Sequence, residues 1–184
     1  MSEKNRSRHI MTITVEAMMT ALSVVIAIFC KSYLNFGMGL FRITFENLPI
    51  ILTGIVLGPV AGGVVGAASD LISYLFSAQV YPPNLLVTLG AALVGVTSGV
   101  MSKFVIRKKG TAQIIVSAGT AHLISSMIIK PIGLYHFYGI LVLWRIPVYL
   151  VIAPLEILAI CMILKRKSLA RLIGYVEESD NELH

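Results

Sequence analysis

The sequence predicts an all-α fold, a polytopic membrane protein whose six transmembrane helices form a bundle. Of its 184 residues, 57% are hydrophobic and only 13% are charged, against about 25% charged in an ordinary soluble protein. Three stretches carry no Asp, Glu, Lys or Arg, namely 47–69, 71–102 and 110–129. Each is long enough for a helix to cross the bilayer, which takes about 20 residues. The chain has no room for a separate soluble domain.

The apolar runs and the short breaks between them predict six helices, at about 11–33, 47–57, 60–76, 84–103, 111–130 and 145–165. The second is anomalous, because a helix of that length spans only about half of the ~30 Å hydrocarbon layer. Pro49 suits the first turn of a helix, and Gly58-Pro59 suits the end of one helix and the start of the next. A single kinked helix over 47–76 is the alternative.

The net charge of +6 reflects membrane orientation and not nucleic-acid binding. If the N-terminus is cytoplasmic, eleven of the fifteen basic residues lie inside, and the outer side keeps only Lys31, Arg42, Lys130 and Arg145. The positive-inside rule then places both termini in the cytoplasm of a cell-membrane protein. We expect a cytoplasmic basic N-terminus at 1–9, the membrane domain at 10–165 and a cytoplasmic polar tail at 166–184.

Small residues recur at every fourth position in two of the helices, as Gly54, Gly58, Gly62 and Gly66 and as Ala91, Gly95 and Gly99. This spacing places them on one helix face and lets another backbone approach closely. We expect the two stripes to pack on each other inside the bundle. A further small pair, Ala17 and Ala21 in the first helix, is flanked by two adaptable methionines.

Ionisable groups inside apolar spans are costly and mark functional or paired positions. Asp70, with Tyr74 one turn beyond it, is interpreted either as a ligand contact or as a hydrogen-bond partner of a neighbouring helix. Glu46 lies four residues from Arg42, so an ion pair and a ligand contact are both open. Glu16 and Glu156 lie near inner basic clusters and are expected to be structural.

Aromatic and polar residues gather in the segments expected to face outward, including Arg42, Tyr81, Asn84, Trp144 and Arg145. A membrane aromatic belt explains part of this pattern. Aromatic faces for stacking, guanidinium groups for carboxylates and an amide suit a planar heterocycle that bears acid groups. The chain has no hydrolase, metalloprotease or P-loop motif. His122 is too isolated to suggest a metal site, so we expect no enzyme activity, metal or cofactor.

Two strings, FRITFENLPIILTGIVLGPVAGGVVGAASDLISYL and YPPNLLVTLGAALVGVTSGV, resemble the substrate-binding membrane subunits (S components) of energy-coupling factor (ECF) vitamin transporters. The patterns R-I-x-F-x-N-x-P-I and G-P-x-x-G-G-x-x-G-A-x-x-D together are similar to the folate-specific group. The resemblance covers about 10–165. It implies a six-helix S-component bundle that captures folate from outside. The partners it implies are membrane lipid, a transmembrane coupling protein and two cytoplasmic ATPases.

The same resemblance implies roles for particular residues. The A-x-x-x-A contact with the coupling protein matches Ala17 and Ala21. Arg42 and Asn84 fall in the matching strings, and the R-I-P-x-Y region adds Trp144, Arg145 and Tyr149. With the residues chosen for their chemistry, the expected ligand-binding set is Arg42, Glu46, Asp70, Tyr74, Tyr81, Asn84, Trp144, Arg145 and Tyr149.

Two alternatives remain open. The chain is an S component for another vitamin or heterocycle, or it is a self-sufficient secondary transporter that uses Asp70 or Glu46 as a proton relay.

Overall fold

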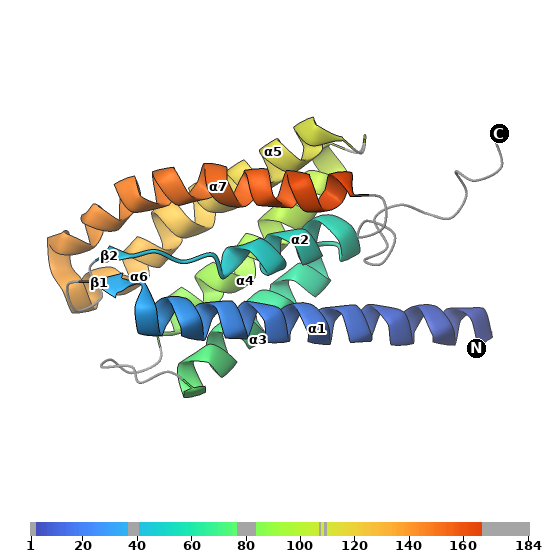
Figure 1. The fold of residues 1–184 in the computed structure, drawn as a ribbon, viewed down its shortest axis with the longest axis horizontal. Coiled ribbons are helices and arrows are strands. Elements are labelled where there is room, and N and C mark those ends of the chain that lie inside the picture. Colours follow the sequence, from blue (N-terminus) through green and yellow to red (C-terminus); the bar gives the residue numbers. More distant parts are fainter. Residues whose placement is uncertain (1–2, 37–40, 77–83, 107, 109, 167–184) are drawn as a thin grey trace.

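Helices lie side by side along the long axis of the molecule in the computed structural model (Figure 1). The structure describes residues 3–36, 41–76, 84–106, 108 and 110–166. Within this part of the chain, five helices are long and apolar enough to cross a membrane, and a sixth apolar helix is shorter. The predicted all-α bundle of six helical segments is therefore confirmed.

The elements follow the predicted order. They are α1 (Glu3–Tyr33), β1 (Asn35–Phe36), β2 (Phe41–Arg42), α2 (Asn47–Leu57), α3 (Pro59–Phe76), α4 (Leu85–Val100), the π-helix η1 (Met101–Val105), α5 (Thr111–Ala121), the π-helix η2 (His122–Ile129), α6 (Lys130–Tyr138), the 3-10 helix η3 (Gly139–Trp144) and α7 (Arg145–Lys165). The two short strands pair antiparallel, with Asn35 opposite Arg42.

The break between α2 and α3 settles the choice between two helices and one kinked helix. Gly58 has a φ of 110°, a conformation that a residue without a side chain adopts readily. α2 ends there and α3 begins at Pro59 and packs against it. The Lys103 ammonium donates to the carbonyl of Leu57, the last residue of α2, at 2.7 Å. A cation suits the last turn of a helix, where the carbonyl groups are unpaired.

The glycine stripes pack on each other as predicted. A Cβ atom built on Gly95 would overlap the backbone of Gly62, and one built on Gly54 would meet Ser98 and the backbone of Gly95. Only glycine lets α2, α3 and α4 approach this closely. The apolar core beside this contact includes Ile50, Ile51, Val65 and Val94, all at most 1% exposed.

Two sequence-based boundaries differ from the structure. α1 already begins at Glu3, so the basic N-terminal residues continue the helix. The fifth predicted helix was to end at residue 130, but helical structure continues through α6 to Tyr138. The prediction that Lys130 lies on the outer side is therefore wrong, because its side chain is inside the bundle and only 4% exposed.

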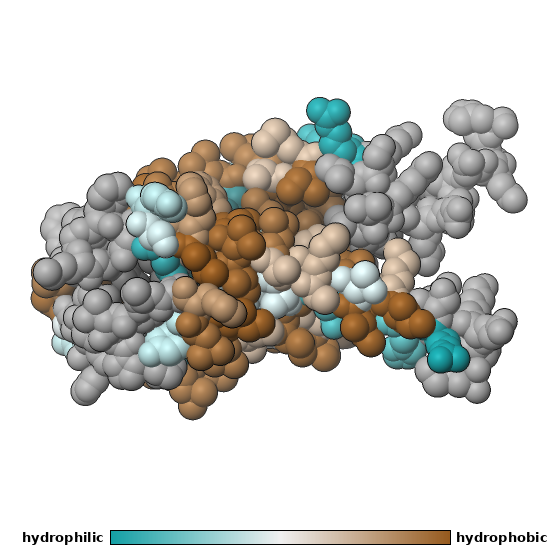
Figure 2. All heavy atoms as spheres, turned by 60° about the horizontal axis from the view of Figure 1, so that its bottom comes forward, coloured by the Kyte–Doolittle hydropathy of each residue, from teal (hydrophilic) through white to brown (hydrophobic). Residues whose placement is uncertain are grey.

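The outer surface is suited to lipid. Figure 2 shows apolar side chains across the middle of the face that it draws. Large apolar residues on several helices are more than half exposed, among them Ile13, Val25, Val60, Leu75 and Leu150. A soluble monomer rarely exposes so much contiguous apolar surface, whereas hydrocarbon covers it without cost.

Candidate ligand-binding site

The N-terminus of α2 lies inside the bundle. Asn47, Pro49 and Ile50 in its first turn are buried. The turn before it is tied to α1, because the Ser23 hydroxyl donates to the backbone carbonyl of Glu46 at 2.8 Å. A helix of eleven residues that starts here brings the positive end of its dipole deep into the membrane domain.

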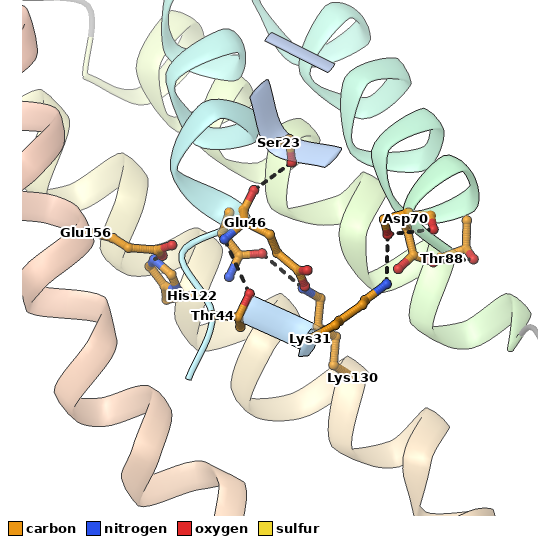
Figure 3. Close-up of polar contacts among 11 residues, drawn as sticks. Ser23, Lys31, Thr44, Glu46, Asp70, Thr88, His122, Lys130 and Glu156 are labelled. Atoms are coloured by element: carbon orange, nitrogen blue, oxygen red, sulfur yellow. Dashed lines mark hydrogen bonds and ion pairs between the residues drawn. The ribbon is translucent and has the colours of Figure 1, made fainter. Parts of the chain in front are cut away.

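A buried lysine joins this helix start to the far side of the bundle (Figure 3). The Lys130 ammonium donates to Asn47 Oδ1 at 2.9 Å and lies 3.7 Å from Glu46 Oε1. Burial of an ammonium group is costly unless it is paired and hydrogen-bonded. The carboxylate and the amide oxygen together compensate Lys130, and Glu46 thus pairs across helices.

A second set of polar residues links α1, α3 and α4. The Thr88 hydroxyl donates to Asp70 Oδ2 at 2.7 Å, the interhelical hydrogen bond that was one of the two interpretations of Asp70. The Lys31 ammonium donates to the Ser73 hydroxyl at 2.8 Å, and that hydroxyl donates to the Asp70 backbone carbonyl at 3.0 Å. These contacts hold α1, α3 and α4 together near the end of α1 and the start of α4.

Glu46 and Asp70 line one small cavity. Its volume is about 10 Å³, and Ser23, Ser69 and Ser73 also face it. Ligand pockets usually measure roughly 300–1,000 Å³, so this cavity is too small for a whole vitamin. The structure brings the two predicted carboxylates to one place, with serine hydroxyl groups around them.

A third polar contact joins η2 to α7. His122 Nε2 lies 2.8 Å from Glu156 Oε2, and the two side chains are 1% and 0% exposed. Figure 3 shows the pair on the side of the Thr44–Glu46 segment away from Lys31 and Asp70. From the sequence, Glu156 was expected to have a structural role near the inner basic cluster. In the structure, its carboxyl group contacts a buried histidine on another helix.

His122→Leu should lower the free energy of unfolding by about 3–5 kcal/mol, because it leaves the Glu156 carboxyl group buried without its partner. Adding Glu156→Leu should recover much of this loss, since two apolar groups then face each other. Thermal unfolding of the purified protein in detergent measures both effects. Additive losses in the double variant would contradict an energetic coupling between the two residues.

Among the predicted ligand residues, Tyr149 is 6% exposed and Tyr74 is half-buried. Asn84 has a structural role: its side chain accepts a hydrogen bond from the Leu86 amide at 2.9 Å and donates to the Gly133 carbonyl. It thereby caps α4 and ties it to α6. Ala17 and Ala21 are exposed on α1, where a partner can reach them.

The remaining predicted residues are only partly described. Arg42 lies in β2, and Trp144 and Arg145 lie where η3 meets α7, but their side chains are outside the description. Tyr81 falls outside the described residues.

The sequence analysis missed Asn47, His122 and Lys130 as site residues. A signal was present, because His122, Ser126 and Lys130 recur at every fourth position within an apolar helix. That spacing gives a helix a polar stripe, and a polar stripe inside a membrane faces other protein groups.

Comparison with known proteins found one matching family and several solved structures with a similar fold. The family model described as ECF transporter, substrate-specific component, matches residues 11–176. A solved structure of FolT bound with folic acid is similar, with a TM-score of 0.66 and 23% identity over 84% of this chain and 92% of that one. The S component of a bacterial ECF transporter is also similar, with a TM-score of 0.59 and 19% identity over 85% and 95%.

No match was found among curated proteins. At these identities, the likeness to the solved structures concerns the fold. The family model covers nearly the whole chain, including every helix that builds the polar contacts described above. The chain therefore belongs to the family of substrate-specific components of ECF transporters.

Proposed function

We propose that this S component captures folate at the outer face of the cell membrane and passes it inward with a transmembrane coupling protein and two cytoplasmic ATPases. The observation that carries the proposal is family membership combined with a fold similar to that of FolT bound with folic acid. The polar groups inside the bundle suit a ligand that combines a planar ring with acidic groups. The protein acts by binding and movement and catalyses no reaction.

The proposed orientation places both termini in the cytoplasm. The beginning of α1 and the end of α7 lie at the same end of the bundle (Figure 1). Lys103, which follows α4, reaches the end of α2, and Lys165 ends α7. Basic residues at this end match the positive-inside rule. The opposite end, with β1, β2 and the start of α7, then faces outward.

We propose that the ligand lies at this outer end, among Arg42, Glu46, Asp70, Tyr74, Tyr81, Asn84, Trp144, Arg145 and Tyr149. Tyr149 supports this position, because it is buried on α7 one turn below Arg145. Guanidinium groups hold carboxylates in a bidentate geometry. The acidic end of folate would therefore remain near the surface, with its ring deeper in the bundle.

The direct test is ligand identification. The full chain is purified in detergent, any bound small molecule is identified by mass spectrometry, and binding of folic acid, thiamin, riboflavin and biotin is measured by calorimetry. We expect saturable binding of folic acid alone. Binding of another vitamin without folic acid would contradict the folate assignment. Proton-driven uptake by the chain alone in liposomes would contradict the role as a subunit.

Arg145→Ala should weaken folic acid binding by roughly 10- to 100-fold, because a hydrogen bond to a charged group contributes about 1.5–3 kcal/mol. Arg145→Lys should recover only part of the loss, since a lysine cannot form the bidentate contact. Calorimetry gives the affinities, and thermal unfolding of the ligand-free variants checks that they remain folded. Unchanged affinity in both variants would remove Arg145 from the site.

A further inference from the structure

The helical segment from η2 into α6 carries four buried polar side chains. His122, Ser125, Ser126 and Lys130 are each at most 4% exposed. All four side chains therefore face the interior of the bundle. The hydroxyl groups of Ser125 and Ser126 have no hydrogen-bond partner among the described residues. Buried polar groups are nearly always paired in native proteins, so this segment presents an unmet requirement for polar contacts.

Asn47 presents a donor beside the same segment. Lys130 donates to Asn47 Oδ1, and an ammonium group can only donate, so this contact fixes which end of the amide is oxygen. The other end, Nδ2, is therefore a donor of known identity. It has no partner among the described residues, and the residue is 0% exposed. Lys130 thus acts on Asn47 as a positioning residue.

Glu156 supplies an acceptor. One of its oxygens contacts His122, and the other, Oε1, has no hydrogen-bond partner within the described chain. Tyr149 is seven residues earlier on α7, which is about 10 Å toward the outer end on the same helix face. Glu156 therefore lies on the same face of α7 as a predicted ligand residue, about two turns deeper in the bundle.

We propose that Asn47, Ser125, Ser126 and Glu156, with Lys130 and His122 as positioning residues, form a subsite that reads the hydrogen-bonding edge of a planar amide-type heterocycle. The Asn47 amide donates to the ring carbonyl, and the Glu156 carboxylate accepts from ring N–H and amino groups. The two serine hydroxyl groups complete the contacts. The 2-amino-4-oxo-pyrimidine ring of folate has such an edge, and this identification rests on the proposed function.

Two irregular helical segments flank the subsite. Pro154 lies inside α7, two residues before Glu156, and it removes one backbone hydrogen bond from the helix. η2 is a π-helix of eight residues, a rare form that is frequently found at functional sites. The proposed subsite requires these two segments to move apart to admit the ring, because its side chains are fully buried in this structure.

The test exchanges donor for acceptor. Wild-type protein should bind folic acid at least roughly tenfold more tightly than its 4-amino analogue, which has a donor in place of the carbonyl acceptor. Asn47→Asp should reduce or reverse this preference. The matched control is Gln113→Glu, the same amide-to-acid change at a buried position on the inner side, where Gln113 donates to Ser102. The control should keep the wild-type preference.

A second pair of variants tests the carboxylate. Wild-type protein should discriminate against a 2-desamino analogue of folic acid, and Glu156→Gln should lose most of this discrimination. The matched control Glu16→Gln, the same change on α1 outside the proposed site, should keep it. This second pair of variants also tests the subsite if the Asn47→Asp variant does not fold. Loss of discrimination in Glu16→Gln alone, or an unchanged preference in both Asn47→Asp and Glu156→Gln, would overturn the subsite. Absence of any folic acid binding by the wild-type protein would overturn the proposed function itself, a different result from binding with unchanged preference.

Discussion

Gly95→Ala should destabilise the protein strongly, although it adds only one methyl group. The added Cβ would overlap the carbonyl group of Gly62, and neither backbone can move away without separating α3 from α4. Overpacking of a well-packed core costs about 1–3 kcal/mol and more where no side chain can give way. We therefore expect a loss of at least about 3 kcal/mol, seen as a lower thermal unfolding midpoint and aggregation during purification.

Gly119→Ala is the matched control for this substitution. Gly119 is also helical, on α5, and a Cβ built there meets nothing within 4 Å. Alanine favours a helix over glycine by about 1 kcal/mol, so this variant should be as stable as the wild type or slightly more stable. Equal stability of Gly95→Ala and the wild type would contradict the close contact between α3 and α4.

Ala17→Trp should spare folic acid binding and block uptake. Ala17 is exposed on α1, away from the buried polar groups. If the coupling protein packs against Ala17 and Ala21, then a large side chain separates the two helices. Vitamin uptake by cells or by reconstituted complexes should fall by roughly tenfold or more, and less coupling protein should co-purify.

Ala112→Trp provides the comparison for that variant, because Ala112 is an exposed alanine on α5 rather than α1. It should retain both binding and uptake. Normal uptake by Ala17→Trp would refute the proposed coupling surface. Loss of folic acid binding by Ala17→Trp would instead assign this part of α1 to the ligand site.

Residue patterns predicted much of the membrane architecture. The apolar runs and the Gly58-Pro59 break located all six helical segments, and the second helix was placed at its observed bounds, 47–57. The small-residue stripes predicted the contact of Gly62 with Gly95. These features depend on local properties, because hydrocarbon requires continuous apolar helices and close backbone contact requires small side chains.

The polar contacts were harder to predict. Lys130 was placed on the outer side because an apolar run ends there, yet α6 carries the helix further and buries it. His122 was judged isolated, although it lies 2.8 Å from Glu156. The two residues are 34 positions apart, and nothing in the pattern of either helix indicates which neighbour it faces.

The sequence by itself therefore determined that the helices lie in a membrane, the order of its six helical segments and the face on which α3 and α4 meet. Only the tertiary structure decided which buried polar groups pair. In it, Glu46 pairs with Lys130, Asp70 with Thr88, and Glu156 with His122. The physical reason is the different distance over which burial and hydrogen bonding act. Burial in hydrocarbon acts on every residue of a segment, whereas a hydrogen bond forms only between two atoms within about 3 Å, whose positions depend on the packing of the whole bundle.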